Sequence, residues 1–201
     1  MFEEKVQKRL QLLDSGADSN KLVEFAEREI HLLEVEEGQA DLTVLLSSPC
    51  ILFKKLEDNG LPYFKNRKCA DYVLFEKKDD NWFVHIFELK RTVKSKSWGH
   101  IKFQFSGALQ NAYALAGALG IEIHMDKVKT YTVYQNDKLR DASNPAKIRY
   151  QIQTKQGNAE SPEQREWNSN TVEIDFIEKV RLEHRKVQLN IETGDGKYRL
   201  A

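Results

Sequence analysis

Two carboxylates and an amine occupy chemically suggestive positions in CADYVLFEKKDDNWFVHIFELKR, residues 69–91. Asp71 precedes the apolar run YVLF, and Glu88 and Lys90 follow the run WFVHIF. Residues two positions apart in a β-strand share a face, so Glu88 and Lys90 are expected side by side. Paired carboxylates can hold Mg²⁺, which takes one or two protein carboxylates and keeps water or phosphate oxygens as its other ligands. An amine beside such an ion can orient a water molecule or neutralise charge on a phosphate.

The polar segment EKKDDN between the two apolar runs predicts the turn of a β-hairpin. A turn centred on residues 79–80 places Asp71 directly opposite Glu88. A turn centred on residues 80–81 places Asp71 opposite Lys90 and leaves Glu88 one diagonal away on the same face. Both registers therefore gather the same three side chains, and only a one-residue bulge would separate them.

The elements around this hairpin predict an α/β protein. Apolar residues at helical spacing indicate helices over residues 3–13, 20–34 and 100–119, the last ending at Gly120. Strand patterns cover residues 42–56 (broken at 47–49), 71–75, 82–90 and 128–135, with further strand-like runs at 148–153, 172–177 and 187–193 and a loop at 154–170. We therefore expect a core over residues 1–139 and a β-rich C-terminal extension over 140–201, within the same domain.

The hairpin motif resembles a known signature. Asp71, sixteen intervening residues and then Glu88-Leu89-Lys90 are similar to the motif of the PD-(D/E)xK nuclease superfamily, although Ala70 stands where that motif has Pro. The order expected over residues 20–135 is also similar to that family's restriction-endonuclease-like core, which has a helix, an antiparallel meander, a second helix and a further strand. The resemblance covers about two-thirds of the chain.

The resemblance implies roles for five side chains. Asp71 and Glu88 would bind Mg²⁺ or Mn²⁺, and Lys90 would assist the attacking water. An acid of the first helix would complete the metal site, and Glu29 matches it best because it falls within the apolar stripe of residues 20–34. A glutamine on the following helix often joins the family's site, and Gln104 matches it on the side expected to face the core.

A basic segment begins at the proposed site. Residues 90–102 contain Lys90, Arg91, Lys94, Lys96 and Lys102 and no acid. The whole chain has 31 basic and 31 acidic residues, so attraction to a polyanion has to come from a local patch of this kind. We expect Arg91, Lys94, Lys96 and Lys102 to contact nucleic-acid phosphates, with an ordinary solvated face as the alternative. Trp98 either stacks on a base or packs in the core.

Composition limits the class of protein. Hydrophobic residues make up 40% of the chain, but no run approaches the roughly 20 apolar residues needed to span a bilayer. The N-terminus MFEEKVQKRLQLL lacks the pattern of a secretory signal, so a cytoplasmic protein without membrane contact is expected.

These observations predict a metal-dependent nuclease that hydrolyses phosphodiester bonds in DNA, with RNA less favoured, in restriction, defence or repair. A homodimer or a partner protein of such a system would fit, because cutting both strands often requires two active sites. The alternative is a nuclease-like fold without activity that serves as a binding or regulatory module in a larger assembly.

Overall fold

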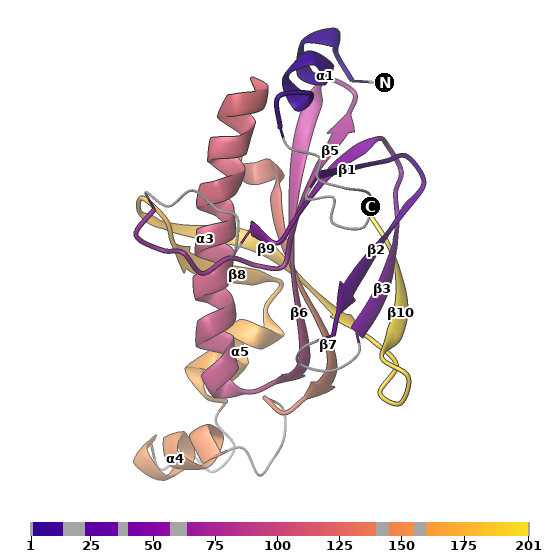
Figure 1. Ribbon diagram of the computed structural model, residues 1–201. Coiled ribbons are helices and arrows are strands. Elements are labelled where there is room, and N and C mark those ends of the chain that lie inside the picture. The colour runs from indigo at the N-terminus through magenta and orange to yellow at the C-terminus, as the bar shows by residue number, and fades with distance from the viewer. Residues whose placement is uncertain are drawn as a thin grey trace.

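The computed structural model describes residues 2–13, 23–35, 40–56, 64–139, 145–154 and 160–200 (Figure 1). Along the chain these form α1 (Glu4–Leu10), β1 (Val23–Ala26), β2 (Glu29–Glu34), β3 (Ala40–Leu45), β4 (Cys50–Lys54), β5 (Tyr72–Lys78), β6 (Asn81–Val93), α3 (Ser95–Leu119), the 3₁₀ helix η2 (Met125–Lys127), β7 (Val128–Asp137), α4 (Pro145–Thr154), α5 (Pro162–Asn168), β8 (Thr171–Asp175), β9 (Lys179–Gln188) and β10 (Asp195–Arg199). The fold is mixed α/β, as expected, with a core made mostly of sheet. None of the helices in these ranges has the length and apolar character required to cross a membrane.

The elements form three layers. A seven-stranded sheet has the order β1-β4-β5-β6-β7-β9-β8, and a three-stranded sheet has the order β10-β3-β2. Figure 1 shows α3 along one face of the large sheet and the small sheet against the other face. Strand β6 is therefore buried on both sides: Ile86 faces the helix-side core, while Phe87 and Leu89 face the core shared with the small sheet. This explains its nearly continuous apolar run.

The β5–β6 hairpin has the first of the two expected registers. Val73 pairs with Ile86 and Phe75 with Val84, as a turn centred on residues 79–80 requires. Asp79 adopts a positive φ of 50° in this turn, a conformation that Asp tolerates better than most residues. The strands β4, β5 and β6 form an antiparallel meander, and the chain then returns through α3 to β7, which pairs parallel to β6.

The expected helix over residues 100–119 is confirmed as α3, which begins earlier, at Ser95. Its buried residues, among them Ile101, Phe105 and Ala108, pack on the large sheet. The helix ends at Gly120, whose φ of 70° lies in the left-handed region that favours glycine.

The helix expected over residues 20–34 is wrong. The described part of this segment forms β1, which pairs with β4, and β2, which pairs with β3. Buried Ile30 and Leu32 alternate with exposed Glu29 and His31, which is the period of a strand. The spacing from Ala26 to Ile30 misled because these residues lie on different strands, β1 and β2, yet both are buried in the core between the two sheets, so they mimic the apolar stripe of a helix.

The other differences concern element boundaries and the C-terminal third. The single strand expected over residues 42–56 is two strands, β3 and β4, which break at 47–49 as expected but enter different sheets. The run 148–153 is part of helix α4, the expected loop 154–170 contains helix α5, and the run 187–193 overlaps only the end of β9. Strand β8 matches the run 172–177, whereas β10 was not expected. Residues 140–144 and 155–159 lie outside the described part.

Strands of this C-terminal third complete both sheets. β9 pairs with β7, and β10 pairs with β3.

A glycine allows the segment before β5 to cross α3. A Cβ on Gly107 would lie only 1.7 Å from the carbonyl oxygen of Lys68. Nearby, Asn66 Nδ2 donates to the carbonyl of Phe103 at 2.9 Å, and Asn66 Oδ1 accepts from the Lys68 N–H at 3.0 Å. These contacts hold the segment against the helix and direct the chain into β5.

We expect Gly107→Ala to lower the free energy of unfolding by about 1–3 kcal/mol, because the added methyl group overpacks this crossing. The matched control is Gly117→Ala in the same helix, where a Cβ would meet no atom within 4 Å. That change should raise stability by roughly 0.5–1 kcal/mol. Urea unfolding of both variants tests this, and equal stabilities would contradict the close crossing.

Candidate functional site

Asp71 lies at the entrance to β5. The last pair of the hairpin ladder joins Tyr72 to Phe87, so Asp71 stands one position beyond it, at the level of Glu88. Its Oδ2 accepts a hydrogen bond of 2.7 Å from the backbone N–H of Leu89. The carboxylate thus takes the place of a strand partner and is held beside the Glu88 backbone.

Glu88 is a buried carboxylate with poor compensation. Its exposed fraction is 0%, and Lys90 Nζ lies 2.9 Å from its Oε1. Besides Lys90, only the backbone of Asp71 among the described groups acts to stabilise the charge of this carboxylate. Burial raises the pKa of Glu88 well above its usual value, the charge of Asp71 adds to the rise, and Lys90 opposes it. A carboxylate in such surroundings would be stabilised by an additional cation.

Glu76, on the same hairpin, shows the opposite situation. It is equally buried, but its Oε1 accepts from the hydroxyls of Ser47 and Ser48 at 3.0 and 3.1 Å. Its Oε2 lies 3.0 Å from His85 Nε2 and 3.2 Å from Lys78 Nζ. Burial acts to raise the pKa of Glu76, but these partners outweigh it and lower the pKa to about 2. Glu76 is therefore a structural carboxylate.

His85 belongs to that structural network and not to the site. Its Nδ1 lies 2.9 Å from the Tyr131 hydroxyl, on the side of the sheet that faces the small sheet. His85 therefore lies on the face of β6 opposite Glu88. Burial lowers the pKa of His85, and the neighbouring Glu76 carboxylate opposes this shift.

One pocket of about 700 Å³ opens beside Asp71. Its lining includes Glu34, Lys54, Lys68 and Tyr72. The Tyr72 hydroxyl accepts from the Leu33 N–H at 3.0 Å and donates to the Leu33 carbonyl at 2.7 Å. This contact ties the end of β2 to the start of β5 and so positions one wall of the pocket.

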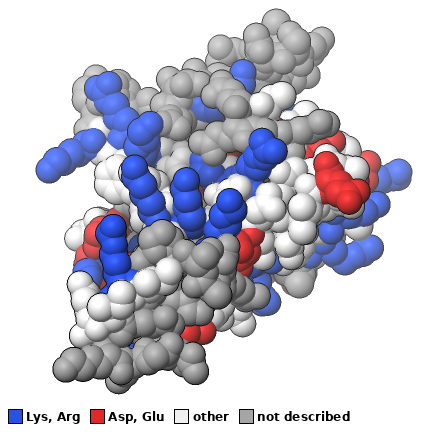
Figure 2. All heavy atoms as spheres, turned by 90° about the horizontal axis from the view of Figure 1, so that it is seen from below, with Lys and Arg blue, Asp and Glu red and all other residues white. Residues whose placement is uncertain are grey.

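A second pocket of about 720 Å³ opens beside Lys90 and is called the basic pocket below. It is lined by Lys68, Lys90, Arg91, Thr92, Lys94, Ser97, His100, Phe103 and Gln104. None of the described lining residues is acidic, and Lys68 lines both pockets. Figure 2 shows Lys and Arg side chains gathered at the lower end of the molecule, where β6 runs into α3 in Figure 1. The charge distribution at this end suits a polyanion.

The structure places Asp71 and Lys90 beside Glu88 on the hairpin. Gln104, which was also predicted for the site, is half-buried in the basic pocket with Lys90. The helical position expected for Glu29 is wrong, because this residue lies on β2, opposite Leu45, and its side chain is half exposed. It lines neither pocket.

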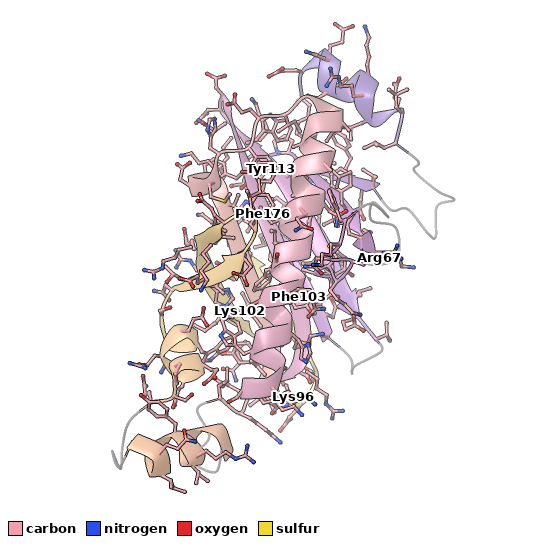
Figure 3. All side chains as sticks on the ribbon, turned by 90° about the vertical axis from the view of Figure 1, so that its left-hand side faces the viewer. Arg67, Lys96, Lys102, Phe103, Tyr113 and Phe176 are labelled. Atoms are coloured by element: carbon pink, nitrogen blue, oxygen red, sulfur yellow. The ribbon has the colours of Figure 1, made fainter. Side chains whose placement is uncertain are left out.

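The basic residues of the predicted segment separate into two groups. Arg91 and Lys94 line the basic pocket, whereas Lys96 is exposed at the start of α3 outside that lining. Lys102 Nζ lies 2.9 Å from Glu166 Oε2, on the side of α3 that faces α5 in Figure 3.

Trp98 packs in the core. It is 1% exposed, and its Nε1 donates to Glu166 Oε2 at 3.0 Å. Of the two roles considered for this side chain, packing is therefore the one observed.

Lys68 was missed by the sequence reasoning. The run KNRK, residues 65–68, lies just upstream of Asp71 and was the available signal. Lys68 reaches the site only because its segment crosses α3 at Gly107. This contact joins segments far apart along the chain, and the spacing of residues in the sequence does not reveal it.

Two carboxylates, Asp71 and Glu88, stand at the same level of the β5–β6 hairpin, and only Asp71 of the two lines a pocket. The described residues contain no group of three or more His, Cys, Asp or Glu side chains arranged to hold a metal ion. Asp71 and Glu88 offer two carboxylates, the number that Mg²⁺ often takes from protein. No protein-family model, curated protein or solved structure matches the chain.

We expect Glu88→Gln and Glu76→Gln to change stability in opposite directions at neutral pH. Because the pKa of Glu88 is raised, its ionisation destabilises the folded protein as pH rises. The free energy of unfolding of Glu88→Gln, relative to that of the parent, should therefore increase with pH. The lowered pKa of Glu76 stabilises the folded protein above the ordinary Glu range, and this contribution is lost as pH falls towards about 2.

Glu76→Gln should therefore be less stable by on the order of 2–3 kcal/mol at neutral pH, with the difference vanishing in acid. Denaturant unfolding at several pH values measures both differences. A Glu88→Gln variant that is less stable than the parent at every pH would show that Glu88 is a satisfied ion-pair partner instead.

Proposed function

We propose that this protein is a metal-dependent nuclease with a restriction-endonuclease-like core that hydrolyses phosphodiester bonds in DNA. One observation carries the proposal. Glu88 is fully buried with a raised pKa, stands in register with Asp71 and contacts Lys90, which in turn lines a pocket with no described acid. Buried acids with perturbed pKa values beside a pocket are typical of functional sites.

The order of elements supports the proposal. The antiparallel meander β4-β5-β6 bears the motif, α3 packs on the sheet, and β7 follows parallel to β6. This is the order that the resemblance implies for the second half of the core. The strands β1 and β2 depart from it, because they stand where a helix was expected.

Each residue has a defined task in this proposal. Asp71 and Glu88 would hold Mg²⁺ or Mn²⁺, which when bound supplies positive charge and a water of lowered pKa. Lys90 lies between Glu88 and the basic pocket, where its ammonium can neutralise charge that develops on a phosphate. The Gln104 amide can hydrogen-bond to a phosphate oxygen in the same pocket.

The basic pocket would hold the neighbouring backbone. Lys68, Arg91 and Lys94 surround it and can bind phosphates on either side of the scissile bond. Burial of Glu88 keeps bulk water away from the carboxylate, which strengthens its electrostatic interactions.

A second candidate is a nuclease-like module that binds nucleic acid without cutting it. The hydrogen bond from Leu89 to Asp71 favours this alternative, because it gives one of the two carboxylates a purely structural task. Binding at the basic pocket would be the same in both cases, so only cleavage separates them.

Cleavage of plasmid DNA with Mg²⁺, Mn²⁺ or EDTA tests the proposal. We expect metal-dependent cleavage, with Glu88→Gln and Lys90→Met slower by about 100-fold or more because each removes charge at the reacting phosphate. The matched control is Lys179→Met, which removes an exposed lysine of β9 that pairs with Glu173. It should cleave at the parent rate.

Two results would contradict the proposal that this protein is a nuclease with its active site at Glu88. Cleavage that survives in Glu88→Gln would place the activity elsewhere. No cleavage with any metal, together with intact DNA binding, would favour the binding module.

Binding at different salt concentrations tests the basic pocket. Arg91→Gln and Lys94→Gln should each weaken DNA binding and reduce the salt slope by about 1. Lys102→Gln should change the slope much less, because Glu166 already neutralises that charge. Fluorescence anisotropy in EDTA measures all three variants, and an equal loss for Lys102→Gln would move the binding surface to the other side of α3.

A further inference from the structure

An aromatic side chain projects into the basic pocket. Phe103 is 52% exposed and lines this pocket together with Lys90 and Arg91. Figure 3 shows it on the outer surface of α3, on the side of the helix where Arg67 lies and away from Lys102. A single exposed Phe is common on protein surfaces, so its position among cations is the informative feature.

The surroundings of Phe103 suit a nucleotide. Lys68, Lys90, Arg91 and Lys94 supply cations for phosphates, and the exposed ring supplies a face on which a base can stack. The pocket volume of about 720 Å³ lies within the range of small-ligand sites. A basic groove that contains an aromatic platform is the combination with which proteins bind single-stranded nucleic acid.

The platform is held in place by the segment that crosses α3. Asn66 donates to the Phe103 carbonyl at 2.9 Å and accepts from the Lys68 N–H at 3.0 Å. One side chain thus couples the backbone of the aromatic residue to that of a pocket lysine. The backbones that carry the ring and this cation are therefore held together at the edge of the pocket.

Among the described Phe, Tyr and Trp residues, Phe103 is the one that lines the basic pocket, and His100 is its only other aromatic ring. Trp98 is buried against Trp167, with ring centroids 5.1 Å apart. Trp98 therefore has no free face for a base, whereas the Phe103 ring is half exposed.

We propose that Phe103 stacks on an unpaired base beside Lys90, so that the preferred substrate is DNA with a single-stranded region at the site. This inference rests on the proposed function and specifies its substrate. Bases inside a duplex are paired and stacked on each other, and their faces cannot reach a side chain without leaving the helix. The phosphate next to the stacked base would then lie towards Lys90 and the carboxylate pair.

Binding without cleavage tests the stack. A short fluorescent single-stranded DNA is titrated in EDTA with the parent, Phe103→Leu and Phe103→Trp. Leu keeps the apolar volume and removes the aromatic face, so Phe103→Leu should bind about tenfold more weakly. Phe103→Trp should bind at least as tightly as the parent. The matched control is Phe25→Leu on β1, because Phe25 is 51% exposed but lines neither the basic pocket nor the pocket beside Asp71.

The same strand with abasic sites in place of its bases separates stacking from general packing. Phe103→Leu and the parent should bind the abasic strand equally, because no base is present to stack. Thermal unfolding of each variant shows that the fold is retained.

The outcomes distinguish the two proposals. If Phe103→Leu and the parent bind the base-bearing strand equally, the stacking proposal is wrong. The nuclease proposal is then still decided by the plasmid cleavage experiment. If Phe103→Leu binds more weakly and no metal supports cleavage, the stack is supported and the nuclease is wrong. If the parent binds no nucleic acid, both proposals fall.

Discussion

The burial of one carboxylate on a central strand is the constraint on which the site depends. Glu88 lies on β6, has no exposed surface and is opposed by the charge of Asp71. Lys90 offsets only part of this cost, since the pKa remains raised. A buried carboxylate of this kind lowers the stability of the fold, and such groups are typical of sites that bind a cation or catalyse a reaction. Glu76 shows that the same hairpin can bury a carboxylate with full compensation where its task is structural.

The layers of the fold explain how this geometry is maintained. Strand β6 is covered by α3 on one face and by the small sheet on the other, so alternate residues have fixed surroundings. The Asp71 carboxylate is held by the Leu89 N–H, and the segment before it crosses α3 at Gly107. The basic pocket forms where this segment, the end of β6 and the start of α3 meet. A rigid core therefore carries the acids, and the crossing segment contributes Lys68.

Much of the site could be predicted from sequence because it lies within one hairpin, where turn position and alternation determine which side chains meet. The register of β5 and β6 followed from that local pattern. The strands β1 and β2 did not, because Ala26 on one strand and Ile30 on the other are buried in the same core and together imitate a helical stripe. Much of β9 was missed because its run KVRLEHRKVQ is highly charged and only Val180 and Leu182 continue an apolar alternation before His184 and Lys186. Lys68 and Phe103 meet only through a contact across distant segments, which no local pattern contains.

The central claim concerns a single carboxyl group, and NMR can observe that group directly. A ¹³C titration of the glutamate side chains, assigned with Glu88→Gln, should show Glu88 titrating above the usual range and Glu76 far below it. Added Mg²⁺ should lower the apparent pKa of Glu88, because the ion binds only the ionised form. An ordinary pKa for Glu88 that does not move with Mg²⁺ would contradict the account.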